Sequence, residues 1–349
     1  MKIEPFLMER MQSTWEHRVE INLSESGVVP LSVRELVDDG DVDALLGEPL
    51  AYVQSNGSEA LRLAVAALHP GAGEDHVEIT TGCAEANYLA AWQLVEPGDE
   101  VVMTLPNYMQ TWGLARAFGA EVKPWRLRPD EAAGRWRPDL DELRRLVRPR
   151  TRLILLCHPN NPTGSCLTAA ELDEIAAVAA LHGAWILCDE VYRGAELAGG
   201  EESPSMWGRG ERVLVTGGLS KAYGLPGLRL GWIVGPPPQI AELWSRHDYT
   251  TIAPATLSDR LATLALEPAR RRRLLERTRS ILRRNLGVIT SWLDALGDRL
   301  TYLPPQAGAM LYLRYRHAVN STVLVERLRR DRGVLVVPGD HYGMDGHLR

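Results

Sequence analysis

The sequence predicts an α/β protein with a mainly parallel sheet covered by helices on both faces, followed by a smaller α+β unit. Apolar runs bounded by turn residues alternate with segments of helical periodicity through the middle of the chain. Because these runs are apolar on both sides, we expect buried parallel strands. The expected strands are Val77–Thr81, Glu100–Leu105, Arg152–Cys157, Ala184–Cys188, Arg212–Thr216 and Gly231–Gly235, and the expected helices cover 85–94, 109–118 and 168–181.

The pattern changes after residue 257. A long helical stretch rich in arginine is expected over 258–296, and two short strands over 311–315 and 334–337. We expect this smaller unit to be cut short, since no closing helix follows its last strand.

Composition narrows the classes of function. The 349 residues include 39 basic and 45 acidic side chains, for a net charge of -6, which argues against a nucleic-acid partner. No apolar run is long enough for a transmembrane helix, and the first residues lack the apolar core of a signal peptide, so we expect a cytoplasmic protein without a membrane partner. The four cysteines show no CxxC spacing, so no metal site is expected.

Polar and glycine-rich loops follow five of the expected strands. Ligands of open α/β sheets bind at the carboxyl ends of the strands, where such loops meet. The loops are Thr81–Glu85, Pro106–Tyr108, His158–Gly164, Asp189–Tyr192 and Leu219–Gly224. The sequence therefore predicts one site at one edge of the sheet.

The most specific segment is Ser220–Gly231, which reads Ser-Lys-x-aromatic-Gly-x-x-Gly-x-Arg-x-Gly. It is not a P-loop, because GxxxxGK[ST] is absent. A partly desolvated lysine amine condenses with aldehydes, and an arginine eight residues later could hold a phosphate. The segment resembles the cofactor-lysine signature of the aspartate aminotransferase superfamily, the fold type I class I and II aminotransferases, which use pyridoxal 5′-phosphate (PLP). The resemblance extends over nearly the whole chain.

The resemblance implies a set of cofactor contacts. Lys221 would form the Schiff base with PLP, and Ser220 and Arg229 would bind its phosphate. The backbone of Cys83 and Ala84 would add N–H donors, since the start of a helix suits an anion.

One position departs from the family pattern. The family usually has Ser or Thr three residues before the lysine, and this chain has Gly218. One phosphate hydrogen bond is therefore missing, or it comes from Thr216 or from water.

The loops near the ring of the cofactor also match the family. Asp189 would keep the ring nitrogen protonated, which strengthens the electron sink. Tyr192, in Asp-x-x-Tyr, and Asn161, in the Asn-Pro-x-Gly turn, would contact the phenolic oxygen. Tyr108 would stack on the ring.

Further matches concern the substrate and a second subunit. Arg349 would pair with the substrate α-carboxylate, with Asn161 and the Ser26-Gly27 loop closing over it. Tyr52, in Tyr-x-x-x-x-Gly-x-x-x-Leu-Arg, would reach the phosphate of a neighbouring subunit, which implies a homodimer with shared active sites.

The resemblance also assigns domains. Residues 46–257 would form the large PLP-binding domain, with a seven-stranded type of sheet, and residues 258–349 the small domain. Residues 1–45 would belong to the small domain and the active-site loop.

Two enzymatic functions fit these motifs. The first is an aminotransferase that moves an amino group between an L-amino acid and a 2-oxo acid. The alternative is suggested by stretches such as Pro124–Pro129 and Arg246–Tyr249, which look like those of capreomycidine synthase-like members of the family. Such an enzyme would perform β-elimination and cyclisation on a hydroxylated arginine. A ligand-sensing regulator is disfavoured, because no helix-turn-helix segment fits before the first motif.

Overall fold

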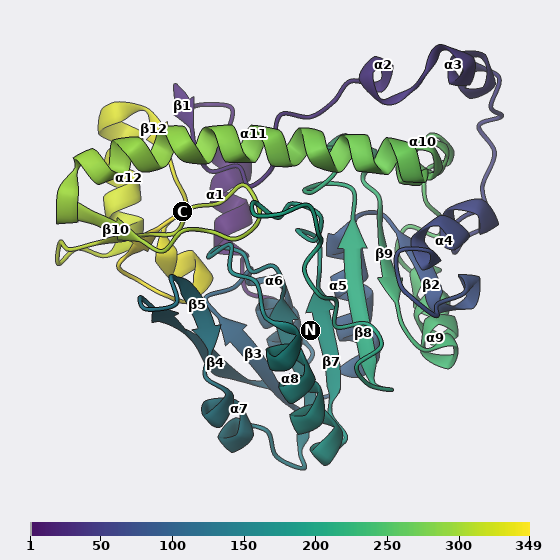
Figure 1. Cartoon of the computed structure of the whole chain (residues 1–349). Helices are drawn as coiled ribbons and strands as arrows, with labels where there is room; N and C mark the ends of the chain where they lie inside the picture. Colours follow the sequence, from purple (N-terminus) through teal and green to yellow (C-terminus); the bar gives the residue numbers. More distant parts are fainter. Residues whose placement is uncertain (1) are drawn as a thin grey trace.

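The computed structural model describes residues 2–349, and its largest element is an eight-stranded sheet (Figure 1). The strands are β2 (Val77–Thr80), β3 (Glu100–Leu105), β4 (Glu121–Asp130), β5 (Arg135–Pro138), β6 (Thr151–Cys157), β7 (Trp185–Asp189), β8 (Val213–Gly218) and β9 (Gly231–Val234). Their order is β2-β9-β8-β7-β6-β3-β4-β5. The five strands from β8 to β4 are parallel, whereas β9 is antiparallel to both of its neighbours and β5 is antiparallel to β4. The mainly parallel sheet expected from the sequence is confirmed; it has one strand more than the seven-stranded type that the resemblance implied, and β4 and β5 were not among the strands expected from the sequence.

Helices cover both faces of this sheet. One face packs against α5 (Cys83–Leu94), α6 (Gln110–Ala117) and α9 (Pro237–His247). The other packs against α4 (Glu59–Ala66), α7 (Leu140–Leu146), α8 (Ala169–His182), α10 (Thr256–Leu266) and α11 (Pro268–Ala295).

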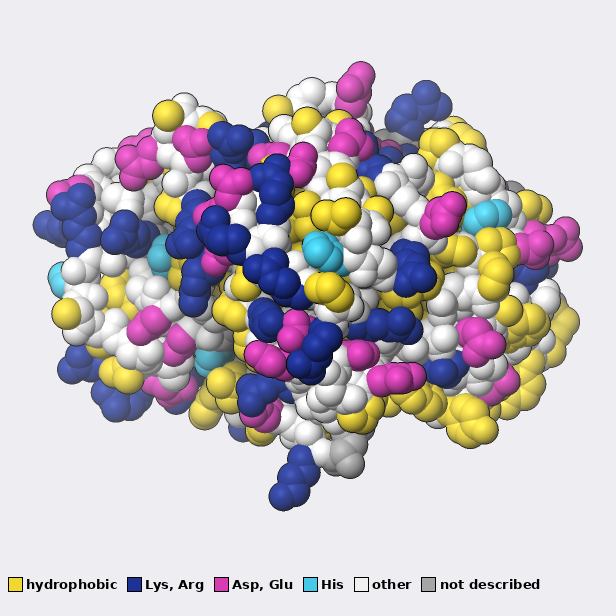
Figure 2. All heavy atoms as spheres, turned by 90° about the horizontal axis from the view of Figure 1, so that it is seen from below, with side chains coloured by type: hydrophobic (Ala, Val, Ile, Leu, Met, Phe, Trp, Pro, Cys, Tyr) yellow, Lys and Arg dark blue, Asp and Glu magenta, His cyan; other side chains and the backbone are white. Residues whose placement is uncertain are grey.

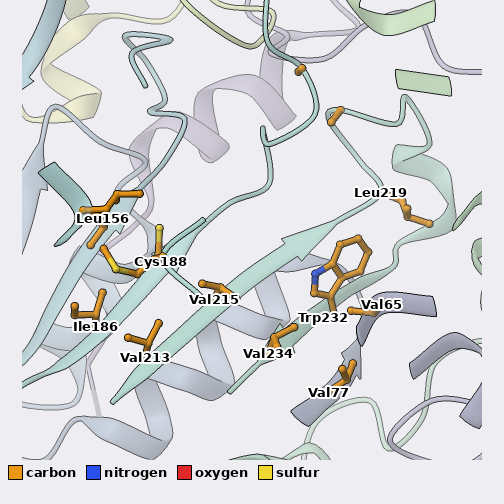
Figure 3. Packing of buried hydrophobic residues seen from close by; sticks show 14 of the residues in the cluster. Val65, Val77, Leu156, Ile186, Cys188, Val213, Val215, Leu219, Trp232 and Val234 are labelled. Carbon is orange, nitrogen blue, oxygen red and sulfur yellow. The ribbon is translucent and has the colours of Figure 1, made fainter. Parts of the chain in front are cut away.

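Side chains alternate between these two cores along each strand, as the pleat requires. In β8, Val213 and Val215 belong to one core and Leu214 to the other. Figure 3 shows Val213 and Val215 near Val234 of β9 and Ile186 of β7. Burial of both faces explains why central strands such as β6 and β8 have no polar alternation.

The expected long helix over 258–296 is two helices. Pro268 is the first residue of α11, and Glu267 before it has an extended backbone with ψ 134°. Proline disfavours helical geometry in the preceding residue but suits the first turn of a helix. The break therefore follows from the proline.

The remaining elements lie outside the large sheet. They are α1 (Leu7–Trp15), β1 (Ile21–Asn22), α2 (Val33–Leu36), α3 (Asp39–Leu46), β10 (Leu300–Tyr302), β11 (Leu313–Tyr315), α12 (Ser321–Arg332), β12 (Val334–Leu335) and β13 (His347–Leu348), together with 3-10 turns at Glu74–His76, Pro226–Leu228, Gly297–Arg299 and Gly339–Tyr342. Strand β1 pairs in parallel with β12, and β11 lies between β10 and β13. Of these elements, α1, β1, α12, β10 and β12 are together on one side of the large sheet, away from α2 and α3 (Figure 1). Figure 1 shows α11 running from α10 to this region. The N-terminal segment and the last strands thus lie together.

The surface carries charges of both signs. Figure 2 shows basic and acidic side chains interspersed on the face seen from below. Ion pairs such as Arg144–Glu174, at 2.6 Å, join neighbouring helices. Among residues 2–349, no helix is both long and apolar enough to cross a membrane.

Candidate active site

A cavity of about 540 Å³ opens at the carboxyl ends of the strands of the large sheet. All five predicted loops contribute to its lining. Helix α1 and the segment between β1 and α2, which contains Glu25 and Ser26, also contribute. The predicted residues that line it are Cys83, Ala84, Tyr108, Asn161, Asp189, Tyr192, Ser220, Lys221 and Arg229. The structure therefore brings together the residues that the sequence placed on separate loops.

Lys221 lies in the loop after β8 and is ion-paired. Its Nζ is 3.0 Å from Oε1 of Glu25, and the lysine side chain is 26% exposed. A Cβ added to Gly27 would lie 3.9 Å from Cδ of Lys221, so the Ser26-Gly27 loop covers the lysine stem. Burial opposes the charge of Glu25, but the ammonium of Lys221 outweighs it and lowers the pKa of that carboxyl below 4.5.

A seat for an anion lies at the start of α5. Gly82 precedes the helix with φ 82°, and the first N–H groups of a helix have no partner within it. The guanidinium of Arg229 covers the glycine so closely that a Cβ there would be 2.4 Å from its Nη2. Nη1 of Arg229 donates to Oγ of Ser220 at 3.3 Å. Helix N–H groups, a hydroxyl and a guanidinium thus converge on one place.

Glycines in β8 and β9 bring α5 close to the sheet. A Cβ on Gly231 would lie 2.4 Å from the backbone nitrogen of Cys83, and one on Gly218 would lie 3.0 Å from the carbonyl oxygen of Leu230. The glycine that replaces the family's Ser or Thr is therefore in a crowded position. Thr216, one of the substitutes considered for the missing hydrogen bond, instead donates to Oδ1 of Asn87 at 2.8 Å.

Asp189 lies at the end of β7 under the floor of the cavity. Its Oδ2 accepts from Nδ2 of Asn87 at 2.9 Å, and its Oδ1 accepts from the backbone of Val191 at 3.0 Å. Burial raises the pKa of Asp189, and these hydrogen bonds only partly oppose the shift. A partly buried carboxylate of this kind is best stabilised by a cation, such as a protonated ring nitrogen.

Asn87 is a site residue that the sequence analysis missed. It lies four residues after Cys83 in α5, so both residues occupy the same face of the helix. Its side chain joins Asp189 to Thr216 and fixes the orientation of the carboxylate. The sequence signal that could have identified Asn87 is a polar residue in an otherwise apolar helix, one helical turn after Cys83.

Asn161 and Tyr192 line the opposite wall of the cavity, and Tyr192 donates to Oγ of Ser26 at 3.0 Å. The predicted residues Arg349 and Gly27 are not among the lining residues. Arg349 is 8% exposed and contacts this wall, since its guanidinium donates to Oδ1 of Asn161 at 3.2 Å and to the carbonyl oxygen of Ser24. No carboxylate among residues 2–349 lies within 4.0 Å of this guanidinium.

Tyr52 does not contribute to this cavity. Its side chain is 89% exposed, and the residue belongs to the segment between α3 and α4. Its predicted role concerns a second subunit and stays a prediction.

Helix α1 closes the cavity and was not foreseen as part of the site. Phe6, Met8, Glu9, Gln12, Ser13 and Glu16 line this side, and we call them the α1 wall. The hydroxyl of Tyr108 donates to Oε1 of Glu9 at 2.8 Å, and the Phe6 ring meets the Tyr108 ring edge-on at 4.9 Å. Tyr108 is therefore held in place by the α1 wall. Elsewhere within 2–349, no group of His, Cys, Asp or Glu is arranged to hold a metal ion.

Comparisons with known proteins agree with this geometry. The sequence profile of the family described as aminotransferase class I and II matches residues 26–349. The chain is 40% identical to a capreomycidine synthase of Streptomyces vinaceus over 302 residues, which are 84% of this chain and 74% of that protein. It is 30% identical to an arginine–pyruvate transaminase of Pseudomonas aeruginosa over 320 residues, 88% of this chain and 79% of that protein. A crystal structure of a PLP-dependent aminotransferase from Streptococcus suis matches with a TM-score of 0.91 and 32% identity, covering 100% of this chain and 92% of the other.

Proposed function

The chain belongs to the aminotransferase class I and II family and uses PLP, and we propose that it moves an amino group between an L-amino acid and a 2-oxo acid. The observation that carries the proposal is the convergence on one cavity of Lys221, the Gly82–Arg229 anion seat and Asp189.

The residues of the cavity fit PLP. The anion seat suits the phosphate, because helix N–H groups and a guanidinium both favour a dianion. The partly buried carboxylate of Asp189 suits the ring nitrogen, and the amine of Lys221 suits the aldehyde. Tyr192 and Asn161, on the opposite wall, supply a phenol and an amide for the phenolic oxygen.

The residues of this chain then have distinct roles. Bound PLP supplies a ring that withdraws electrons from the substrate Cα. Nζ of Lys221 would take the proton from that carbon and return it, as a general base and acid. Arg349 would hold the α-carboxylate with its planar guanidinium, since it is buried with no carboxylate partner among residues 2–349. Together, these residues would orient the substrate so that Lys221 can reach its Cα proton.

A second reaction has support from one relative. The similarity to capreomycidine synthase covers 84% of the chain, which favours β-elimination and cyclisation on a hydroxylated arginine as the alternative. Both reactions begin when Lys221 removes the Cα proton, so the same cavity serves either. Only elimination needs a leaving group on the β-carbon, and only transamination needs a 2-oxo acid acceptor.

The two reactions are separated by their products. A panel of amino acids, including arginine and its hydroxylated forms, is incubated with the holoenzyme with and without 2-oxoglutarate, and the products are identified by mass. A 2-oxo acid that forms only with the acceptor supports transamination. Loss of water from a hydroxylated arginine without an acceptor supports the alternative instead.

We also propose that two copies form a dimer with shared sites. The support is the exposure of Tyr52 together with neighbouring apolar side chains, Leu46 and Leu50, which are 81% and 82% exposed. Contiguous exposed apolar groups are characteristic of interaction surfaces.

A further inference from the structure

We propose that the substrate amino acid carries a positively charged side chain and that Glu9 and Glu16 of the α1 wall receive that charge. This inference rests on the proposed function, because it concerns the substrate of the same cavity. It applies to both candidate reactions.

The first support is the spacing of polar residues along α1. Glu9, Gln12, Ser13 and Glu16 all line the cavity and recur at intervals of three and four residues. Such residues lie on one face of a helix. The opposite face carries Arg10 and Thr14, so the carboxylates are on the side that faces the substrate.

The second support is the balance of charge in the cavity. The cations that line it are Lys221 and Arg229, and both are already engaged, since Lys221 pairs with Glu25 and Arg229 covers the anion seat. Glu9 accepts a hydrogen bond from Tyr108 and has no cation within 4.0 Å among the described residues. Glu16 has only His17 at 3.4 Å, and the side chain of His17 is 89% exposed.

Glu16 is also in a position that a structural role would not favour. It caps the C-terminal end of α1, where the helix dipole is negative. A carboxylate there is repelled by the helix end unless a cation lies nearby. A cationic group in the cavity would offset this cost.

The α1 wall is joined to the residue proposed to hold the α-carboxylate. Nε2 of Gln12 donates to the carbonyl oxygen of Ser24 at 2.6 Å, and the same oxygen accepts from Arg349. Glu9 and Glu16 lie three and four residues from Gln12, so each is about one helical turn, roughly 5 Å along the axis, from it and on opposite sides. A cationic group would therefore contact one of these carboxylates directly, while the other adds to the negative potential of the wall.

The test compares charged and neutral amino acids of matched shape. Dissociation constants from the holoenzyme are measured by calorimetry for L-arginine and L-lysine and for L-citrulline, which is nearly isosteric with arginine but uncharged. We expect arginine or lysine to bind at least about tenfold more tightly than citrulline, because a hydrogen bond to a charged group is stronger than one to a neutral group.

Two variants and a control assign the effect to the α1 wall. Glu9→Gln and Glu16→Gln keep the shape and the acceptor oxygen, and together they are expected to reduce the preference for the charged amino acid about tenfold while citrulline binding is unchanged. Glu4→Gln removes a charge from the same segment outside the cavity lining, where Glu4 pairs with Arg116, and should leave the preference intact.

The outcomes separate the two proposals. A holoenzyme that binds citrulline, or neutral or acidic amino acids, as tightly as arginine and lysine overturns this inference alone. An unchanged preference in the double variant overturns the assignment to Glu9 and Glu16. If no amino acid binds or alters the absorbance of the cofactor, the proposed function fails, and this inference fails with it.

Discussion

The carboxylate of Glu25 lies 3.0 Å from Nζ of Lys221, although the two residues are 196 positions apart in the sequence. The ammonium of the lysine therefore has a partner supplied by the N-terminal segment. Because Glu25 and Lys221 both line the cavity, the N-terminal segment contributes to the candidate site as well as to the fold.

Lys221 is the expected site of covalent attachment of PLP. The chain has only three lysines, Lys2, Lys123 and Lys221, so the assignment is readily checked. Purified protein should be yellow, and borohydride should fix the cofactor to one peptide. Lys221→Ala should abolish this label, as mass analysis of the peptides would show, whereas Lys123→Ala should keep it. A labelled peptide in Lys221→Ala would mean that another amine holds the cofactor.

Gly82→Ala is expected to weaken cofactor binding more than it weakens folding. The new Cβ would lie 2.4 Å from Nη2 of Arg229 and push the guanidinium away from the anion seat. Gly98→Ala is the matched control, because Gly98 has φ 91° but nothing within 4 Å of an added Cβ. Both variants share a backbone penalty of about 1 kcal/mol. Equal dissociation constants for PLP in the two variants would show that the cofactor does not bind at the anion seat.

Asp189→Asn should reduce turnover by about 10²-fold or more, because asparagine cannot hold a proton on the ring nitrogen. The protein without cofactor should be as stable as the wild type or more so. Burial raises the pKa of Asp189, so its charge costs free energy in the folded state at neutral pH. Rates and melting temperatures are compared with those of Asp75→Asn, an exposed position. Near-normal turnover in Asp189→Asn would remove this residue from the mechanism.

The buried pair of Glu78 and His247 should make stability depend on pH. Nδ1 of His247 lies 2.6 Å from Oε1 of Glu78, and both side chains are inaccessible. Burial raises the pKa of Glu78 to about 7, and the bond to Glu78 outweighs burial and raises the pKa of His247. Both folded-state pKa values exceed those of the unfolded chain, so the folded state binds more protons and stability falls as the pH rises.

The pH range of this effect follows from the shift in the pKa of Glu78, from 4.5 to about 7. Between these pH values the free energy of unfolding should fall on the order of 1–3 kcal/mol more in the wild type than in Glu78→Gln. Denaturant titrations at several pH values measure this difference, with Glu201→Gln as an exposed control. Parallel pH profiles for wild type and Glu78→Gln would contradict the prediction.

Mixing two impaired variants tests the proposed shared site. If Tyr52 reaches the phosphate of the other subunit, a heterodimer of Tyr52→Phe and Lys221→Ala has one site with both wild-type residues and one site with both defects. Activity should therefore rise when the two homodimers exchange subunits. If exchange is demonstrated and activity stays at the mean of the parents, Tyr52 acts within its own chain or not at all.

The central sheet could be predicted because its strands are buried on both faces and are therefore apolar. Strands β4 and β5 were not foreseen, since they form an edge of the sheet and alternate with charged residues such as Arg126 and Arg128. β4 also contains Pro124 and Pro129, which argue against a strand paired on both sides, although β4 lies between β3 and the edge strand β5.

The sequence predicted those site residues that lie at or shortly after the end of a strand and within a dense motif. Lys221, Asp189 and Asn161 do so, and the structure places all three on one cavity, while their roles stay predictions. The α1 wall gave no such signal, because its contacts are distant in sequence. Glu9 and Tyr108, for example, are 99 positions apart, and only tertiary packing joins them.

The pairing of Arg349 with Ser24 has a consequence for the order in which the protein is made. The two residues are 325 positions apart, and Arg349 is also 188 positions from Asn161. All strands of the large sheet, the anion seat and the lysine leave the ribosome long before Arg349 does. A growing chain can therefore complete these elements before Arg349 emerges, whereas the proposed contact of Arg349 with a substrate carboxylate has to wait until residue 349 joins residue 24.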